Sequence, residues 1–169
     1  GTQTWPRSAT GEGVRAYLTP SVVMGAGTPT VQLNYTNTTP TSGRLTPATP
    51  SLPIINATSP VGSIAYAGTG AGKFGPFIPL AAGDQGILSV QSIQFSATMT
   101  SGVMNLVLCK PLLTLPITTV GVCSERDLVN QLPSMPRIYD GANLQWLMYA
   151  GAATPVNSSF FGHIDVAWG

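Results

Sequence analysis

The chain has 169 residues, the length of a single domain, and a net charge of +1 from 7 basic and 6 acidic residues. Charged residues make up 8% of the sequence, against about 25% in ordinary globular proteins. So few basic residues do not form the patch that a nucleic-acid duplex requires, and no apolar run reaches the roughly 18 residues of a membrane span. We therefore expect no direct nucleic-acid partner and no membrane partner.

The low charge is itself informative. A freely diffusing soluble domain usually keeps about 25–35% charged residues on its surface. A chain with 8% charged residues is expected to hold much of its surface against other molecules. The composition favours a subunit of an assembly over a diffusing enzyme, although neutral β-proteins rich in Ser and Thr also exist as monomers.

The first thirty residues mix Gly, Pro and short apolar patches. We interpret residues 1–30 as an extended N-terminal arm with one or two short strands. Trp5, next to Pro6, is the best candidate for an interface anchor in this arm, because aromatic side chains concentrate in buried interface hot spots.

The rest of the chain, residues 31–169, is expected to be a single β-domain. Residues 31–36 alternate apolar and polar side chains, which predicts a half-buried strand. Residues 37–61 are rich in Thr and Pro, and proline disfavours both helix and sheet interiors. This window predicts an extended excursion suited to contacts with a partner.

A hairpin is the clearest expectation. Residues 93–99 and 103–110 both alternate, and the Ser101-Gly102 dipeptide between them is a hairpin signal. With that loop every apolar residue falls on one face. The expected cross-strand pairs are Met99 with Met104, Ala97 with Leu106, and Phe95 with Leu108.

One short helix and two final strands complete the expected elements. Ser124 and Asp127 are spaced as a capping box, and Pro133 would end the helix that they open. Residues 144–150 and 160–168 have apolar alternation, which predicts strands docked in a sheet with Trp146 and Trp168 in the core. The sum is an all-β fold: an antiparallel β-sandwich or jelly-roll-like barrel, with an extended N-terminal arm and one short helix.

Candidate chemistry is sparse. The run from Gly68 to Lys73 lacks the spacing of a phosphate-binding loop, and His163 with Asp165 makes only two of the three or four ligands that zinc requires. Cys109 and Cys123 are expected to be reduced thiols, although the sequence leaves their pairing open. We expect no enzyme activity, no catalytic residue, no metal and no cofactor.

Several phrases in the chain resemble virion proteins of tailed bacteriophages. The resemblance covers about residues 31–169, and its motifs are structural. They are Val31-Gln-Leu-Asn-Tyr-Thr-Asn followed by Ser42-Gly43-Arg44, Pro79-Leu80-Ala-Ala-Gly83-Asp84-Gln-Gly86-Ile87 running into Val90-Gln-Ser-Ile93, Ser124-Glu-Arg-Asp127 through Pro136-Arg137-Ile-Tyr139-Asp140-Gly141, and Gly162-His-Ile-Asp-Val-Ala-Trp168-Gly169.

The resemblance implies a capsid-associated protein, most similar to the decoration or cement proteins of the phage head. It implies the major capsid protein and further copies of the chain, as a homotrimer, as partners. It also implies assembly in the bacterial cytoplasm and a place on the capsid surface of the virion. The residues expected to carry contacts are Trp5, Arg7, Tyr17, Thr38, Thr39, Arg44 and Leu52.

Two alternatives stay open from the sequence. The chain is compatible with a neck, tail or fibre component, and with a carbohydrate- or receptor-binding β-module that uses an exposed Trp or Tyr. A hydrolase is the third hypothesis, and no motif in the chain has the structural context that such an enzyme requires.

Overall fold

The computed structural model describes most of the first two thirds of the chain and parts of the last third. The described residues are 3–4, 8–27, 29–47, 61–64, 76–119, 121–127, 136–148, 159–162 and 164–166. Several positions discussed above lie outside them: Trp5, Arg7, Leu52, the run 68–73, His163, Trp168 and much of the Thr/Pro-rich window.

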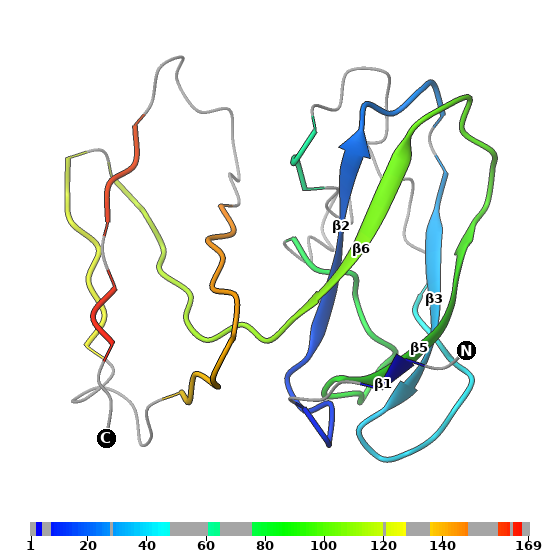
Figure 1. Ribbon diagram of the computed structural model, residues 1–169, viewed down its shortest axis with the longest axis horizontal. Helices are drawn as coiled ribbons and strands as arrows, with labels where there is room; N and C mark the ends of the chain where they lie inside the picture. The colour runs from blue at the N-terminus through cyan, green and yellow to red at the C-terminus, as the bar shows by residue number, and fades with distance from the viewer. Residues whose placement is uncertain are drawn as a thin grey trace.

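The described residues form six strands in two antiparallel sheets, and none of these residues is helical. One sheet has the strand order β1-β5-β3-β4 and the other pairs β2 with β6 (Figure 1). In the described part of the chain the sheets do not close into a barrel. The all-β, antiparallel expectation is therefore confirmed. The strands are β1 (Gln3–Thr4), β2 (Arg15–Val22), β3 (Val31–Asn37), β4 (Arg44–Leu45), β5 (Ile87–Phe95) and β6 (Val103–Cys109).

One long antiparallel ribbon crosses from the first sheet to the second. Strands β2 and β6 pair from Arg15 opposite Cys109 to Val22 opposite Val103, and β3 and β5 pair along their length. The segments that connect these strands run side by side and continue the ladder. Their backbone hydrogen bonds run from Gly25 N to Ser101 O (2.8 Å), from Thr100 N to Ala26 O (3.4 Å) and from Ser96 N to Thr30 O (3.0 Å).

The bend of this ribbon requires glycine. A Cβ at Gly25 would overlap Thr100 Oγ1 and lie 2.7 Å from Ser101 N, because the two connecting segments approach closely there. Gly102 has a φ of +116° on the same turn, a conformation that L side chains rarely adopt. These two glycines allow both strands of the ribbon to turn together.

The expected hairpin between residues 93–99 and 103–110 is wrong. Strand β5 pairs with β1 and β3, whereas β6 pairs with β2, so Ser101-Gly102 belongs to a crossing between sheets. The alternation correctly marks the core-facing side, because Ile93, Met99, Met104, Leu106 and Leu108 all pack against the core. Period two identifies a buried face but not the neighbouring strand. Leu106 lies opposite Leu18, and Phe95 lies opposite Val31.

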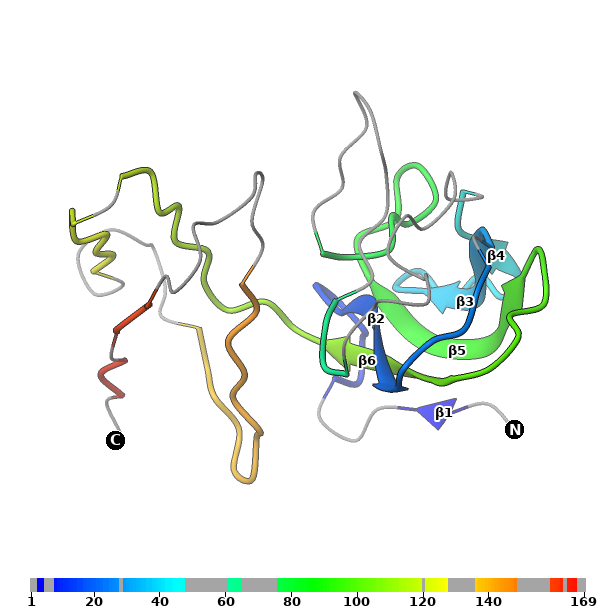
Figure 2. The same cartoon turned by 90° about the horizontal axis from the view of Figure 1, so that it is seen from above.

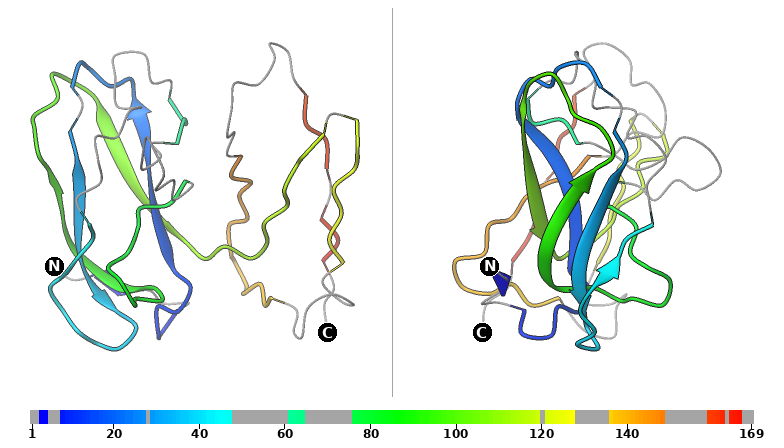
Figure 3. Two further views of the ribbon diagram at one scale, coloured as in Figure 1. Left: turned by 180° about the vertical axis from the view of Figure 1, so that it is seen from behind. Right: turned by 90° about the vertical axis from the view of Figure 1, so that its right-hand side faces the viewer.

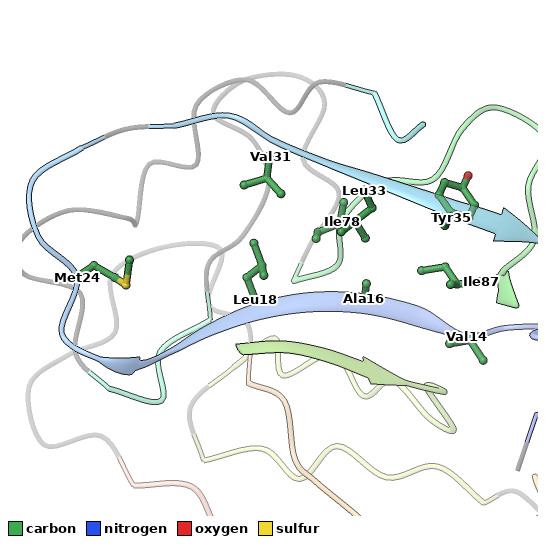
Figure 4. Close-up of a cluster of buried hydrophobic side chains, with 9 residues drawn as sticks. All are labelled: Val14, Ala16, Leu18, Met24, Val31, Leu33, Tyr35, Ile78 and Ile87. Atoms are coloured by element: carbon green, nitrogen blue, oxygen red, sulfur yellow. The ribbon is translucent and has the colours of Figure 1, made fainter. Parts of the chain in front are cut away.

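The core lies between β2 and β3 (Figure 4). Alternate residues of β3 point into it, since Val31, Leu33 and Tyr35 are fully buried while the residues between them are half-buried. This confirms the strand expected at 31–36. The buried cluster consists of Val14, Ala16, Leu18, Met24, Val31, Leu33, Tyr35, Ile78 and Ile87.

The structure differs from the arm expected at residues 1–30. Val14, Ala16 and Leu18 alternate along the chain and are buried, so β2 is a core strand. Strand β1 pairs with β5, with Gln3 opposite Val90. The Gly and Pro residues that suggested an arm lie mainly in the turns around these strands, and the short apolar patches between them form the strand.

After β6 the chain leaves the two sheets and runs beside them as irregular backbone (Figure 1, Figure 2 and Figure 3). We call residues 110–166 the C-terminal segment; its described residues contain no strand and no helix. The expected final strands are wrong where they are described, and Trp146 is 67% exposed instead of buried.

The expected helix at 124–133 is also wrong in its described first turn. Ser124 Oγ donates to the Pro116 carbonyl at 2.8 Å, and Arg126 donates to the Thr114 carbonyl at 3.1 Å. These bonds to an earlier part of the chain take the place of a helix cap. Residues 128–133 lie outside the described residues.

The bend provides a first prediction. In Gly102→Ala the new Cβ would lie 2.6 Å from Met24 Sδ and 2.9 Å from Met24 Cα, at a strained φ. We expect the free energy of unfolding, measured by urea denaturation, to fall by about 2–4 kcal/mol. Gly43→Ala is the matched control: its φ is +73°, but no atom lies within 4 Å of the added Cβ. It should cost about 1 kcal/mol, and equal losses in the two variants would contradict the close packing of the bend.

Candidate functional site

A buried carboxylate ties the turn 81–86 to the larger sheet. Asp84 Oδ2 accepts hydrogen bonds from the Tyr35 hydroxyl (2.5 Å) and from Arg44 Nε (3.0 Å). Its Oδ1 accepts from Asn37 Nδ2 (2.9 Å) and from Arg44 Nη2 (3.1 Å). The Tyr35 hydroxyl in turn accepts from the backbone N–H of Ala81 at 2.9 Å. The side chains come from β3, from β4 and from a turn whose Gly83 has a φ of +86°.

The environment of this carboxylate keeps it ionised. Burial raises the pKa of Asp84, since its side chain is only 5% exposed, but hydrogen bonds from Arg44, Asn37 and Tyr35 and the charge of Arg44 outweigh burial. Together they lower the pKa from 3.8 to about 2. Burial and the bond to Asp84 raise the pKa of Tyr35 to about 12.

This cluster is a structural clamp. Both carboxylate oxygens have two donors, and Arg44 has a further bond to the Ala82 carbonyl at 3.3 Å. An acid or base in catalysis needs a lone pair or proton that points at a substrate. Here the oxygens of Asp84 and the hydroxyl of Tyr35 are already hydrogen-bonded to other groups of the cluster. A solvent-open hollow of about 470 Å³ beside the turn, between Arg15 and residues 77–84, adds no further carboxylate.

The described residues offer no metal centre and no disulfide. They contain no group of three or more His, Cys, Asp or Glu side chains positioned to hold a metal ion. Cys109 and Cys123 are both free thiols, the first half-buried and the second exposed. No described helix is long and apolar enough to cross a membrane.

Tyr17 connects the smaller sheet to the C-terminal segment. It lies on β2 between Ala16 and Leu18, so its side chain projects from the face opposite the core. Nevertheless it is only 4% exposed, and its hydroxyl donates to Gln145 Oε1 at 2.9 Å. Burial, together with nearby Cys109, raises the pKa of Tyr17. The outer face of the smaller sheet is thus a contact surface for the segment.

The C-terminal segment carries most of the exposed large hydrophobic side chains of the described residues. Phe161 is 95% exposed and Trp146 67%. With about 150–250 Å² for a whole aromatic side chain, the exposed parts total on the order of 1,000 Å². Soluble monomers rarely expose a contiguous apolar patch larger than a few hundred Å² unless it binds something. The exposed residues are Ile117, Val122, Ile138, Tyr139, Leu144, Trp146, Met148, Phe160, Phe161, Ile164 and Val166.

Local contacts shape this segment without burying it. A Cβ at Gly162 would lie 3.4 Å from Trp146 Cη2, so the indole packs against the Gly162 backbone. The Arg137 guanidinium lies over the Tyr139 ring, 5.2 Å from its centroid. The described residues 136–148 and 159–162 therefore approach each other at Trp146 and Gly162.

The expected contact residues are spread over different environments. Thr38 is half-buried and Thr39 exposed in the β3–β4 loop, Arg44 is paired with Asp84, and Tyr17 is covered near Gln145. Trp5, Arg7 and Leu52 lie outside the described residues. Sequence reasoning missed the C-terminal segment as a surface, because its apolar alternation has the same pattern as a core strand.

The clamp provides a second prediction. Asp84→Asn keeps the shape but removes the charge that pairs with Arg44, so the free energy of unfolding at pH 7 should fall by about 1–3 kcal/mol. A pKa lowered from 3.8 to about 2 stabilises the folded state above pH 3.8, and this contribution is lost as pH falls toward 2. Urea unfolding from pH 7 to pH 2 checks both effects.

In Asp84→Asn the part of the acid sensitivity due to this group should be absent. Asp140→Asn, an exposed carboxylate, is the control and should stay within about 0.5 kcal/mol of the parent chain. If Asp84→Asn and the parent chain lost stability equally between pH 4 and pH 2, the clamp would not act through ionised Asp84.

Comparison of the chain with models of known protein families, with curated proteins and with solved structures finds no match.

Proposed function

We propose that the chain is a non-enzymatic structural protein of a bacteriophage virion that binds and stabilises the capsid as a decoration or cement protein. The observation that carries this proposal is the exposed apolar surface of the C-terminal segment, on the order of 1,000 Å². A standard protein interface buries about 800 Å² on each partner. The segment therefore supplies enough surface for a stable contact with another subunit.

The low charge supports the same proposal. With 8% charged residues and a net charge of +1, the chain has little electrostatic steering toward or away from a partner. Binding would rest on apolar burial, at about 25 cal/mol for each Å² removed from water. Apolar contacts are not weakened by salt. This property suits a shell that encloses a genome with its counterions.

In this proposal the two sheets form the rigid body of the subunit, packed as a β-sandwich. Support for the sandwich comes from the side chains of β2 and β3, which meet in one core. The C-terminal segment contacts the major capsid protein and further copies of the chain, as a homotrimer on the capsid surface, after assembly in the bacterial cytoplasm. No residue has a catalytic role.

A third prediction tests this function in the particle. Quantitative mass spectrometry of virions from the phage that encodes the chain should find it at a copy number comparable to that of the major shell protein. Particles that lack it should release their genome at a lower temperature, and added purified protein should restore the parent temperature. A small definite copy number would indicate a neck, tail or fibre component instead.

The outcome that contradicts the proposal is complete absence of the chain from purified virions. It would favour the second candidate, a carbohydrate- or receptor-binding module. The observation for that candidate is the indole of Trp146, which is 67% exposed in a stretch where Asn143 is exposed as well. A glycan array would then have to yield hits that Trp146→Ser abolishes, because aromatic stacking on sugars would carry the affinity.

A further inference from the structure

Strand β6 has an edge that pairs with no other strand in the described part of the chain. It pairs with β2 along its other edge only. The other strand of this sheet is covered, because Ile78 N donates to the Ala16 carbonyl (2.8 Å) and Gly62 N to the Pro20 carbonyl (3.0 Å). Strands β1 and β4, at the edges of the larger sheet, have two residues each, against seven in β6.

The residues of β6 do nothing to block a further strand. Natural proteins protect long edges with charged side chains, proline or bulges. The sequence Val103–Cys109 contains no charged residue and no proline, and its ladder with β2 is regular from Met104 to Cys109. The backbone groups of alternate residues in this seven-residue strand, which point away from β2, therefore form a site for strand addition, in which main-chain hydrogen bonds supply affinity.

A strand-like sequence without a partner lies in the C-terminal segment. Residues 144–148 place Leu144, Trp146 and Met148 at alternating positions, all of them 46–67% exposed. No strand is assigned to these described residues, and the stretch contains no charge. Pairing between identical copies can place like charges opposite each other. Two neutral strands pair without that repulsion.

The geometry favours pairing between copies over pairing within one chain. In its own copy Gln145 of this stretch accepts a hydrogen bond from Tyr17 on the outer face of the β2–β6 sheet, and the stretch is not paired with β6. None of the backbone hydrogen bonds among the described residues involves residues 144–148. The roughly 34 residues between Cys109 and Leu144 would span up to about 110 Å when extended, so reach does not limit the contact.

We propose that copies of this chain associate by strand addition, with residues 144–148 of one copy along the β6 edge of the next. Each copy donates one strand and accepts one, and such a head-to-tail contact closes into a ring when the rotation permits. The inference rests on the self-association in the proposed function and names the surface that makes it. Its test uses purified protein without virions, so its failure is distinguishable from failure of the capsid role.

The fourth prediction concerns the mass of the full chain in solution. Sedimentation analysis should give an oligomer, with three times the 17.5 kDa of one chain as the expected ring. Leu147→Pro removes a backbone donor from the added strand, and Asn105→Lys places a charge on the exposed acceptor strand. Each should weaken association by about tenfold or more.

Matched controls keep the test decisive. Thr118→Pro introduces the same residue at another exposed, irregular position of the C-terminal segment, and Ser42→Lys adds the same charge on the β3–β4 loop. Both should associate within about twofold of the parent chain. Circular dichroism and urea midpoints equal to those of the parent show that each variant is folded.

Three outcomes would overturn the inference. The first is a parent chain that stays monomeric up to about 100 μM, tenfold above a 10 μM Kd. The second is folded Leu147→Pro and Asn105→Lys chains that associate like the parent. The third is a monomeric parent whose Asn105→Lys variant alone fails to bind capsids, which would identify a capsid-protein strand as the occupant of the β6 edge.

Discussion

The antiparallel pairing of residues 15–37 with residues 87–109 is the constraint on which the rest of this structure depends. It runs through both sheets and across the bend between them, with backbone hydrogen bonds at Gly25, Thr100 and Ser96. Because the ribbon folds over itself, the alternating apolar residues of β2 face those of β3. The same folding leaves β6 at the edge of a two-stranded sheet, from which the C-terminal segment departs.

Electrostatics plays a local part within this frame. The ion pair between Arg44 and Asp84 is directed inward, with two donors on each carboxylate oxygen, and it holds the turn that precedes β5. A buried charge pair of this kind offsets the cost of removing both charges from water only when its hydrogen bonds are satisfied. The C-terminal segment instead carries eleven exposed large hydrophobic side chains among its described residues. Charge thus stabilises the subunit, while contacts between subunits would rest on apolar burial and open backbone.

Local alternation predicted the buried faces of the strands well. Val31, Leu33 and Tyr35 are buried as their spacing indicates, and Met104, Leu106 and Leu108 face the core. Which strands pair with each other could not be predicted from the sequence, because a buried face is compatible with more than one neighbouring strand. The Ser101-Gly102 dipeptide suits a bend between sheets as well as a hairpin. The only sequence sign that two neighbouring segments bend together is the second glycine, Gly25.

The candidate site was missed for a related reason. Leu144, Trp146 and Met148 alternate like a core strand, and the sequence does not say whether the core belongs to the same copy. Similarly, Ser124 was assigned to a helix cap from its spacing to Asp127, yet its hydroxyl bonds to Pro116. Arg44 and Asp84 lie forty residues apart, so their pairing follows from the fold and not from any local pattern.

The central claim is that the ribbon folds without the C-terminal segment, which is then free for contacts between subunits. Hydrogen exchange tests this claim most directly. In dilute protein the amides of β2, β3, β5 and β6 should be protected, while those of 136–148, 159–162 and 164–166 exchange rapidly apart from the turn at Ala142. In the assembled state the C-terminal amides should become protected and the ribbon should change little. Strong protection of residues 144–148 in the dilute single chain would contradict the account, because it would place that strand in the subunit's own core.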